Sequence, residues 1–337
     1  MRITVLAGGI GGSRFLRGLL SALGSPDGTP PEGDVTVIGN TGDDIWIHGL
    51  RVCPDLDTVM YTLGGGISAE RGWGREDESF VVREELAAYG VEPTWFGLGD
   101  RDLATHLVRT QSLAAGYTLT QVTQALCDRW QPGARLLPMT DDRAETHVVI
   151  DDPRGTTAPD GTPLRTAVHF QEWWIRYGAR PPAHEFVLVG AESATPGPDV
   201  LEAITAADVV LLPPSNPVVS IGTILQVPGI AEAVRTTPAP VVGVSPIIGG
   251  APVRGMADAC LRAIGVETTA GGVGAHYGAR RHGGLLDTWI IDTVDADQLT
   301  VIAEAGLDCV VTSTLMTDLA AAADLARTCL DAAERAG

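Results

Sequence analysis

The chain has 337 residues, of which 45% are hydrophobic and 41 are glycines, and this composition fits a globular α/β protein with a large core. A formal net charge of −19 excludes nucleic acid and anionic lipid as partners, because both require a basic surface. No apolar run approaches the length of a membrane span, and residues 1–5 show a strand pattern rather than a signal peptide. We therefore expect a cytoplasmic protein with no membrane partner.

A strand pattern at residues 3–7 leads through a glycine-rich turn into a helix that we expect to begin near Ser13. Glycine lets the backbone approach an anion closely, and the amide groups at a helix N-terminus attract negative charge. Serine is also a preferred helix cap. The turn therefore predicts a phosphate site made of Gly8, Gly9, Gly11, Gly12 and Ser13.

Two better-known phosphate loops match this turn poorly. A dinucleotide fingerprint has a third glycine where this chain has Arg14, and an acidic residue after the next strand, where this chain has Asn40. A Walker loop needs a lysine, and all 23 basic residues of this chain are arginines. A strand-to-helix turn without any ligand is the structural alternative.

A second strand pattern at residues 34–39 ends in a polar turn. Open α/β sheets bind ligands at the carboxyl ends of their strands, and paired carboxylates beside a phosphate site favour Mg²⁺. Alternatively, the two acids cap a helix that starts at Ile45. Asp55 and Asp57 follow at the start of a short helix, where one acid can cap and the other can bind. The candidate site residues of the polar turn are Asn40, Thr41, Asp43 and Asp44.

Helical spacing dominates the next segment, with helices expected at 78–89, 102–114 and 119–130. A charged turn with Arg101 and Asp102 precedes the second of them, and His106 follows one helical turn later. This turn either faces a ligand or is only a helix cap with an Asp–Arg pair.

Strands and helices alternate regularly after residue 185, with strands expected at 186–189, 208–212, 240–244, 288–291 and 309–312. The turns after the second and third of these strands carry hydroxyl, amide and glycine groups, which can bind a base edge or a phosphate without charge. The candidates in these two turns are Ser215, Asn216, Pro217, Ser245, Pro246, Gly249 and Gly250.

These patterns together predict an α/β fold with a Rossmann-like, mostly parallel sheet, helices on both faces and a smaller helical insertion domain. We expect residues 1–54 and 133–337 to form the nucleotide-binding domain and residues 55–132 to form the insertion.

Seven motifs, in order along nearly the whole chain, resemble the 2-phospho-L-lactate transferases of coenzyme F(420) biosynthesis, known as CofD in archaea and FbiA in actinobacteria. They are the glycine loop at 8–12 and the motifs at 40–44, 54–59, 98–106, 171–174, 214–217 and 245–249. The absence of lysine and the abundance of alanine and glycine are typical of a GC-rich genome. They favour the actinobacterial branch, whose members use a phosphoenolpyruvyl donor.

The resemblance implies a transferase with Mg²⁺ as cofactor. The terminal ribityl hydroxyl of the deazaflavin Fo attacks the phosphorus that carries a three-carbon acid in a guanosine diphospho-donor, and GMP leaves. The acid is phosphoenolpyruvate or 2-phospho-L-lactate. Positioning and charge neutralisation are the main requirements of such a reaction. The family also leads us to expect a homodimer.

By matching motif, the glycine loop binds the diphosphate, and the turns at 215–217 and 245–250 bind the guanosine. Asp57 and Arg101 bind the deazaflavin, with Asp102 and His106 beside them, and Asp57 orients the attacking hydroxyl. The Mg²⁺ ligand is Asp43 or Asp44, with Asp57 in second place. We therefore expect Asp57, Asp44 and Arg101 to be the catalytic residues.

A different class of function is the main alternative. A related branch of the gluconeogenesis-factor type shares the glycine loop and binds a nucleotide-sugar as a regulator without catalysis. The motifs at 55–58 and 100–102 favour the transferase, because a protein that only binds has no need of an acceptor site. A Rossmann oxidoreductase is disfavoured by Arg14 and Asn40.

Overall fold

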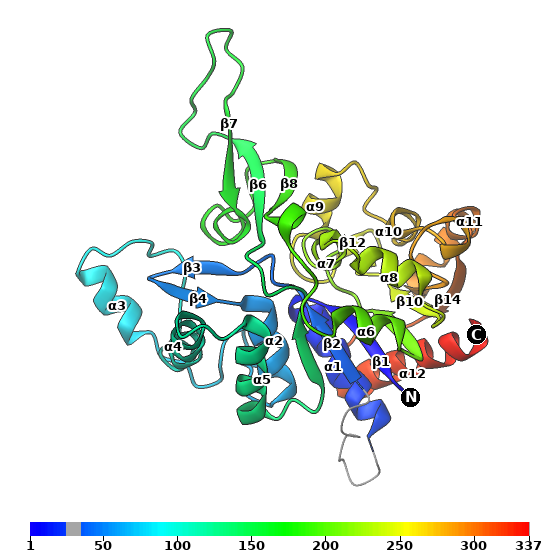
Figure 1. Cartoon of the computed structure of the whole chain (residues 1–337). Coiled ribbons are helices and arrows are strands. Elements are labelled where there is room, and N and C mark those ends of the chain that lie inside the picture. The colour runs from blue at the N-terminus through cyan, green and yellow to red at the C-terminus, as the bar shows by residue number, and fades with distance from the viewer. Residues whose placement is uncertain (25–34, 337) are drawn as a thin grey trace.

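The computed structural model describes residues 1–24 and 35–336 (Figure 1). At its centre lies a sheet of seven parallel strands in the order β14-β13-β10-β9-β1-β2-β5. The strands are β1 (Ile3–Ala7), β2 (Val35–Gly39), β5 (Arg135–Pro138), β9 (Val209–Leu212), β10 (Val241–Val244), β13 (Thr288–Asp292) and β14 (Asp308–Thr312). The predicted α/β fold with a mostly parallel sheet is confirmed.

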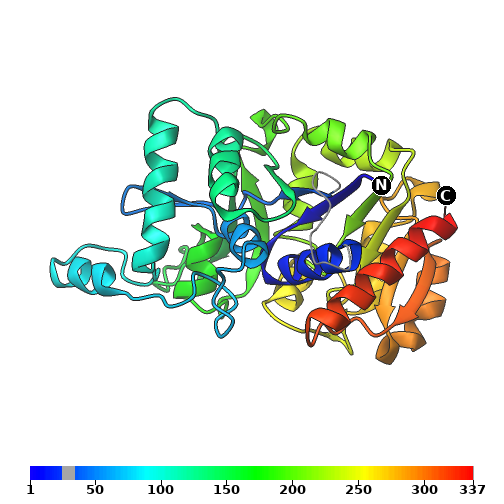
Figure 2. The same ribbon diagram turned by 90° about the horizontal axis from the view of Figure 1, so that it is seen from below.

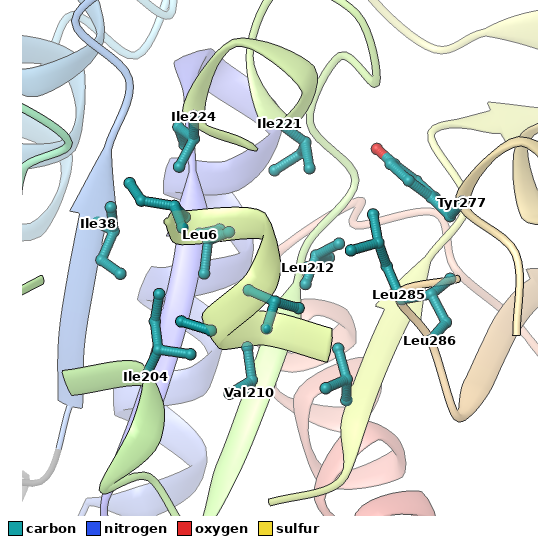
Figure 3. Close-up of a cluster of buried hydrophobic side chains, with 14 of the residues drawn as sticks. Leu6, Ile38, Ile204, Val210, Leu212, Ile221, Ile224, Tyr277, Leu285 and Leu286 are labelled. Carbon is teal, nitrogen blue, oxygen red and sulfur yellow. The ribbon is translucent and has the colours of Figure 1, made fainter. Parts of the chain in front are cut away.

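Helices cover both faces of this sheet because its side chains alternate between two hydrophobic cores. Ile3 and Val5 of β1 belong to the core under α1, α2, α5 and α12. Leu6 belongs to the opposite core, under α6, α7, α8, α10 and α11, part of which is drawn in Figure 3. The helices are α1 (Gly9–Leu23), α2 (Pro54–Leu63), α5 (Leu119–Trp130), α6 (Val200–Thr205), α7 (Ile221–Gln226), α8 (Ile230–Thr236), α9 (Ala257–Ala263), α10 (Ala270–Tyr277), α11 (Leu299–Glu304) and α12 (Leu319–Ala336).

The first and last helices lie side by side beneath the sheet, as Figure 2 shows. They approach closely at Gly18, where an added Cβ would lie 2.4 Å from the carbonyl carbon of Ala322. Only glycine fits at this position without a shift of α1 or α12. The helix that follows the glycine loop is therefore supported by the C-terminal helix.

The direction of chain winding reverses between β1 and β9. From β1 the chain passes outward to β2 and β5 on one side, then returns to β9 and continues outward to β10, β13 and β14 on the other. Loops leaving two neighbouring strands in opposite directions open a crevice at their carboxyl ends, where α/β proteins bind ligands. The crevice here lies between the glycine loop after β1 and the loop after β9.

The crossover from β2 to β5 holds the hairpin of β3 (Ile45–Ile47) and β4 (Leu50–Val52) and four helices, including α3 (Val81–Ala88) and α4 (Asp100–Ala114). Helices α2 and α5 pack on the central sheet, whereas α3 and α4 lie beyond them (Figure 1). The three helices predicted here are confirmed. The division into two domains stays a prediction.

Two local predictions and one structural alternative in the first 60 residues are wrong. Helix α1 begins at Gly9 with Gly8 as its N-cap, so Ser13 does not cap it; the Ser13 hydroxyl instead donates to the Gly9 carbonyl oxygen at 2.7 Å. Residues 45–47 form a strand, so Asp43 and Asp44 have no helix to cap. The N-cap of α2 is Cys53, and Asp55 and Asp57 lie in the first helical turn.

A second sheet corrects the predicted position of the strand at 186–189. This strand is part of β8 (Ala183–Val189), which pairs antiparallel with β6 (Glu145–Asp151), and β6 also pairs with β7 (Arg165–His169). Exposure alternates along the end of β8, where Leu188 is buried and its neighbours Val187 and Val189 are exposed, as in a sheet with one solvent face. The sheet projects from the central sheet in Figure 1. Within the described residues, no helix combines the length and apolar character of a membrane span.

Candidate active site

One cavity of about 640 Å³ opens at the carboxyl ends of β1, β9 and β10. Its walls come from the glycine loop, the loops after β9 and β10, the start of α2, and the segment between α2 and α4. The predicted site residues that line it are Gly8, Gly9, Gly11, Asp43, Asp57, Asp102, His106, Ser215, Asn216, Ser245 and Pro246. The remaining candidates do not line it: Gly12, Ser13, Asn40, Thr41, Asp44, Arg101, Pro217, Gly249 and Gly250.

Gly8 and Gly11 of the glycine loop are packed too tightly for a side chain. A Cβ on Gly8 would lie 2.5 Å from Asp55 Oδ2, and one on Gly11 would lie 2.3 Å from the Pro214 carbonyl oxygen. Gly9 has a φ of +62°, in the left-handed region that favours glycine. The loop thus brings the first turn of α1 to the cavity wall, where its amide groups can bind an anion.

The loops after β1 and β9 are joined by hydrogen bonds. The Ser215 hydroxyl donates to the Gly8 carbonyl oxygen at 2.9 Å, and the Gly8 amide lies 3.3 Å from the same hydroxyl. Asn216 Oδ1 accepts from the backbone amides of Val218 and Val219. Ser215 and Asn216 therefore fix the shape of the loop after β9. Most of their hydrogen bonds are made within the cavity wall itself.

The two aspartates of the turn after β2 have different surroundings. Arg51 of β4 donates to Asp44 at 2.9 Å, and both side chains are buried. Burial raises the pKa of Asp44 to about 6, and the charge of Arg51 opposes this shift. Asp44 thus forms an ion pair with Arg51 and does not line the cavity, whereas Asp43 does.

Asp43 and Asp55 form a buried pair of carboxylates in the cavity wall, and we call them the acid pair. Burial raises the pKa of Asp43 well above its ordinary range, and the negative charge of Asp55 raises it further. Burial likewise raises the pKa of Asp55 to about 6, although the Asn40 amide donates to this carboxylate at 2.9 Å. Within the described chain, Asp43 Oδ1 has no hydrogen-bond partner. A cation at the acid pair would offset this like-charge repulsion.

Asp57 is held by a residue that was not among the sequence candidates. Arg109 of α4 is buried, and its two terminal nitrogens donate to the two carboxylate oxygens of Asp57. Burial alone would lower the pKa of the Arg109 guanidinium, but the Asp57 carboxylate raises it above its ordinary value. The pair is a bidentate, charge-assisted contact that fixes the orientation of Asp57 at the cavity.

The same arginine orders the neighbouring His106. Arg109 Nη1 lies 3.2 Å from His106 Nδ1, and because a guanidinium can only donate, Nδ1 must accept and the ring proton is on Nε2. That nitrogen lies 3.5 Å from Asp102 Oδ2, and the Tyr61 hydroxyl donates to Asp102 Oδ1 at 2.6 Å. Burial would raise the pKa of Asp102, but His106 and Tyr61 hold it below its ordinary value.

Arg101 does not take part in this network. Its side chain is exposed, and its backbone amide donates to Glu78 Oε1 at 2.6 Å. Aromatic side chains from α2, from the segment before α4 and from residues 170–174 line the cavity instead, and we call them the aromatic wall. The aromatic side chains that line the cavity are Tyr61, Trp73, Phe80, Trp95, Phe96, Phe170 and Trp174.

A family model described as "2-phospho-L-lactate transferase CofD" matches residues 3–324 of the chain. The chain belongs to this CofD family. A phosphoenolpyruvate transferase of Streptomyces coelicolor is 62% identical over 334 residues, which cover 99% of this chain and 98% of that protein. A phosphoenolpyruvate transferase of Thermobifida fusca is 66% identical over 305 residues, covering 90% and 89%. As a member of the CofD family, the chain is a transferase.

Solved structures with the same fold are more distant in sequence from this CofD-family chain. A crystal structure of a UPF0052 family member from Bacillus halodurans has a TM-score of 0.59 at 16% identity, with 98% of each chain covered. A second structure of a Bacillus halodurans protein gives 0.61 at 18% identity. At these identities the likeness shows the fold alone.

Proposed function

We propose that the protein transfers a phosphoenolpyruvyl group, or the related 2-phospho-L-lactyl group, from a guanosine diphospho-donor to the terminal ribityl hydroxyl of the deazaflavin Fo. The hydroxyl oxygen bonds to the phosphorus that carries the three-carbon acid. The bond from that phosphorus to the bridging oxygen breaks, GMP leaves, and the hydroxyl proton is released. The product is coenzyme F(420)-0, or its dehydro form when the phosphoenolpyruvyl group is transferred, with a new phosphodiester.

The observation that carries this proposal is that one cavity joins two unlike surfaces. One surface is the glycine loop, at the start of a helix, with the acid pair. The other is the aromatic wall, which suits a flat tricyclic ring. Asp57, held by Arg109, lines the same cavity and can position an attacking hydroxyl there. The names of the relatives agree with the transferred group.

The acid pair fits Mg²⁺ by its chemistry. Two buried carboxylates, one with an unpartnered oxygen, supply the hard ligands that this ion prefers. In residues 1–24 and 35–336, no three His, Cys, Asp or Glu side chains come together as a metal site, so the other ligands would be water and substrate oxygens. When bound, the ion would neutralise charge on the diphosphate. We therefore propose Asp43 and Asp55, rather than Asp44, as its protein ligands.

Asp57 and Arg109 act as one unit in the proposed reaction. Each oxygen of Asp57 accepts from Arg109 and retains a lone pair that can accept the hydrogen bond of the ribityl hydroxyl. Because Arg109 fixes the carboxylate, the hydroxyl is held in one direction relative to the phosphorus. Arg101 has no part here, and the aromatic wall takes its place in binding the deazaflavin.

Mass spectrometry of the product formed from Fo with each of the two donors tests the proposal. We expect Fo to gain the mass of the phospho-acid and GMP to appear in equal amount. Wild-type protein that binds a nucleotide-sugar tightly but shows no saturable binding of Fo would support the regulatory alternative instead. The expected homodimer is also part of the proposal, and light scattering at several protein concentrations tests it.

A further inference from the structure

Three arginines line the cavity and have no role assigned so far, and two of them, Arg14 and Arg254, lie near each other. Arg14 is on α1, one helical turn after Ile10, and Arg254 lies in the loop after β12 (Ala251–Pro252). A Cβ at Gly72 would lie 2.9 Å from Arg254 Nη1 and 3.5 Å from Ile10 Cδ1, so Arg254 and the first turn of α1 approach the same glycine. Arg14 and Arg254 both line the cavity that contains the glycine loop.

These two side chains lack a carboxylate partner. All salt bridges found among residues 1–24 and 35–336 are made by other cations. Their charges are thus available to a ligand.

The two guanidinium groups also repel each other. Burial lowers the pKa of Arg14, and the positive charge of Arg254 lowers it further. The repulsion costs more for the partly buried Arg14 than for the exposed Arg254, and an anion between the two charges would offset it. The same wall contains the amide groups at the start of α1, which attract an anion as well.

We infer that Arg14 and Arg254 form an anion clamp for the donor, and this inference rests on the proposed function. The clamp binds an anionic oxygen group, either the carboxylate of the transferred acid or the phosphate that carries it. Arginine suits both, since its planar fork donates two parallel hydrogen bonds to either group. Arg14 thus gives the glycine loop a charged donor at the position where a dinucleotide fingerprint has glycine.

Calorimetry and steady-state kinetics with the variants Arg14→Gln and Arg254→Gln test the clamp. The probes are GMP, GDP and the phosphoenolpyruvyl diphospho-guanosine donor. If the clamp binds phosphate, each variant weakens GDP binding by about 10-fold or more and leaves GMP binding unchanged. If it binds the carboxylate, GDP binding is unchanged and kcat/KM for the donor falls by about 10-fold or more. Either pattern supports the clamp.

Matched controls separate the clamp from general effects on α1. Arg17→Gln removes an exposed charge from the same helix, and we expect it to change none of these affinities. Arg14→Lys keeps the charge and should recover part of the lost affinity, while thermal unfolding confirms that each variant folds. Raising the salt concentration should weaken donor binding less in Arg254→Gln than in wild type.

The clamp is refuted if both glutamine variants bind all three probes, and turn over the donor, within twofold of wild type. That result would leave the transferase intact. In contrast, wild-type protein that binds GDP without any turnover of Fo would overturn the proposed function, and the GDP and GMP titrations would still test the phosphate form of the clamp.

Discussion

Arg109 donates from both of its terminal nitrogens to the two carboxylate oxygens of Asp57, and both side chains are buried. The arginine comes from α4 and the aspartate from α2, so this contact fastens the crossover helices to each other at the cavity. The orientation of Asp57 therefore depends on a helix that starts more than 40 residues later in the chain.

The first prediction concerns the stability of this pair. Arg109→Gln should lower the free energy of unfolding by about 3 kcal/mol or more, because it leaves the Asp57 charge buried without a partner. The double variant Arg109→Gln with Asp57→Asn should recover part of that loss. Urea unfolding of wild type, the two single variants and the double variant measures the coupling. Additive losses would show that the two side chains do not depend on each other.

The second prediction separates orientation of the hydroxyl from binding of the deazaflavin. Asp57→Asn should lower kcat by about 100-fold with little change in Fo affinity, because the contact strengthens as the hydroxyl loses its proton. Trp174→Ala in the aromatic wall should instead weaken Fo binding. Fluorescence titration with Fo and steady-state kinetics measure the two quantities. Equal losses of Fo affinity in both variants would contradict the role given to Asp57.

The third prediction concerns the metal. EDTA should abolish turnover and Mg²⁺ should restore it. At pH 7.5, Mg²⁺ should also raise the melting temperature of the wild type, and Asp43→Asn should remove this shift because it removes one ligand. Asp44→Asn should lower stability by removing the buried ion pair with Arg51, which would keep only its longer contact to Glu145, yet preserve the Mg²⁺ shift. If the Mg²⁺-dependent rise in melting temperature survives in Asp43→Asn but disappears in Asp44→Asn, Asp44 is the ligand and the assignment to Asp43 is wrong.

The fourth prediction follows from the raised pKa of Asp55. Between about pH 4 and pH 6, the folded protein holds a proton on Asp55 that the unfolded chain has released. Raising the pH through this range therefore lowers the free energy of unfolding, by about 1 to 3 kcal/mol for a shift of this size. Asp55→Asn cannot ionise and keeps an oxygen for the Asn40 amide, so its unfolding free energy should vary less with pH. Urea unfolding at pH 4, 5, 6 and 7.5 makes the comparison, and parallel curves would refute the assignment.

Candidate residues in the turns that follow strands could be predicted from the sequence. In a parallel sheet the carboxyl ends of the strands meet at one edge, so turns after β1, β2, β9 and β10 had to lie near one another. The glycine loop and Asp43 were chosen as candidate site residues on this basis. The same reasoning could not separate Asp43 from Asp44, because the hairpin that brings Arg51 to Asp44 depends on tertiary contacts.

Residues within helices were harder to predict. Arg109 is a charged residue in an amphipathic helix, and the local pattern gives no reason to place it in the interior. Arg101 lies in a charged turn that looks like a binding motif, but the turn directs its side chain to solvent. The helical spacing from His106 to Arg109, which puts both on one face of α4, was the one available signal.

The contact between Gly18 and Ala322 has a consequence for synthesis of the protein. Helix α1 is translated long before α12, which packs against it. Until residues 319–336 have been translated, the side of α1 around Gly18 has no partner helix. The helix behind the glycine loop therefore lacks this support during much of synthesis.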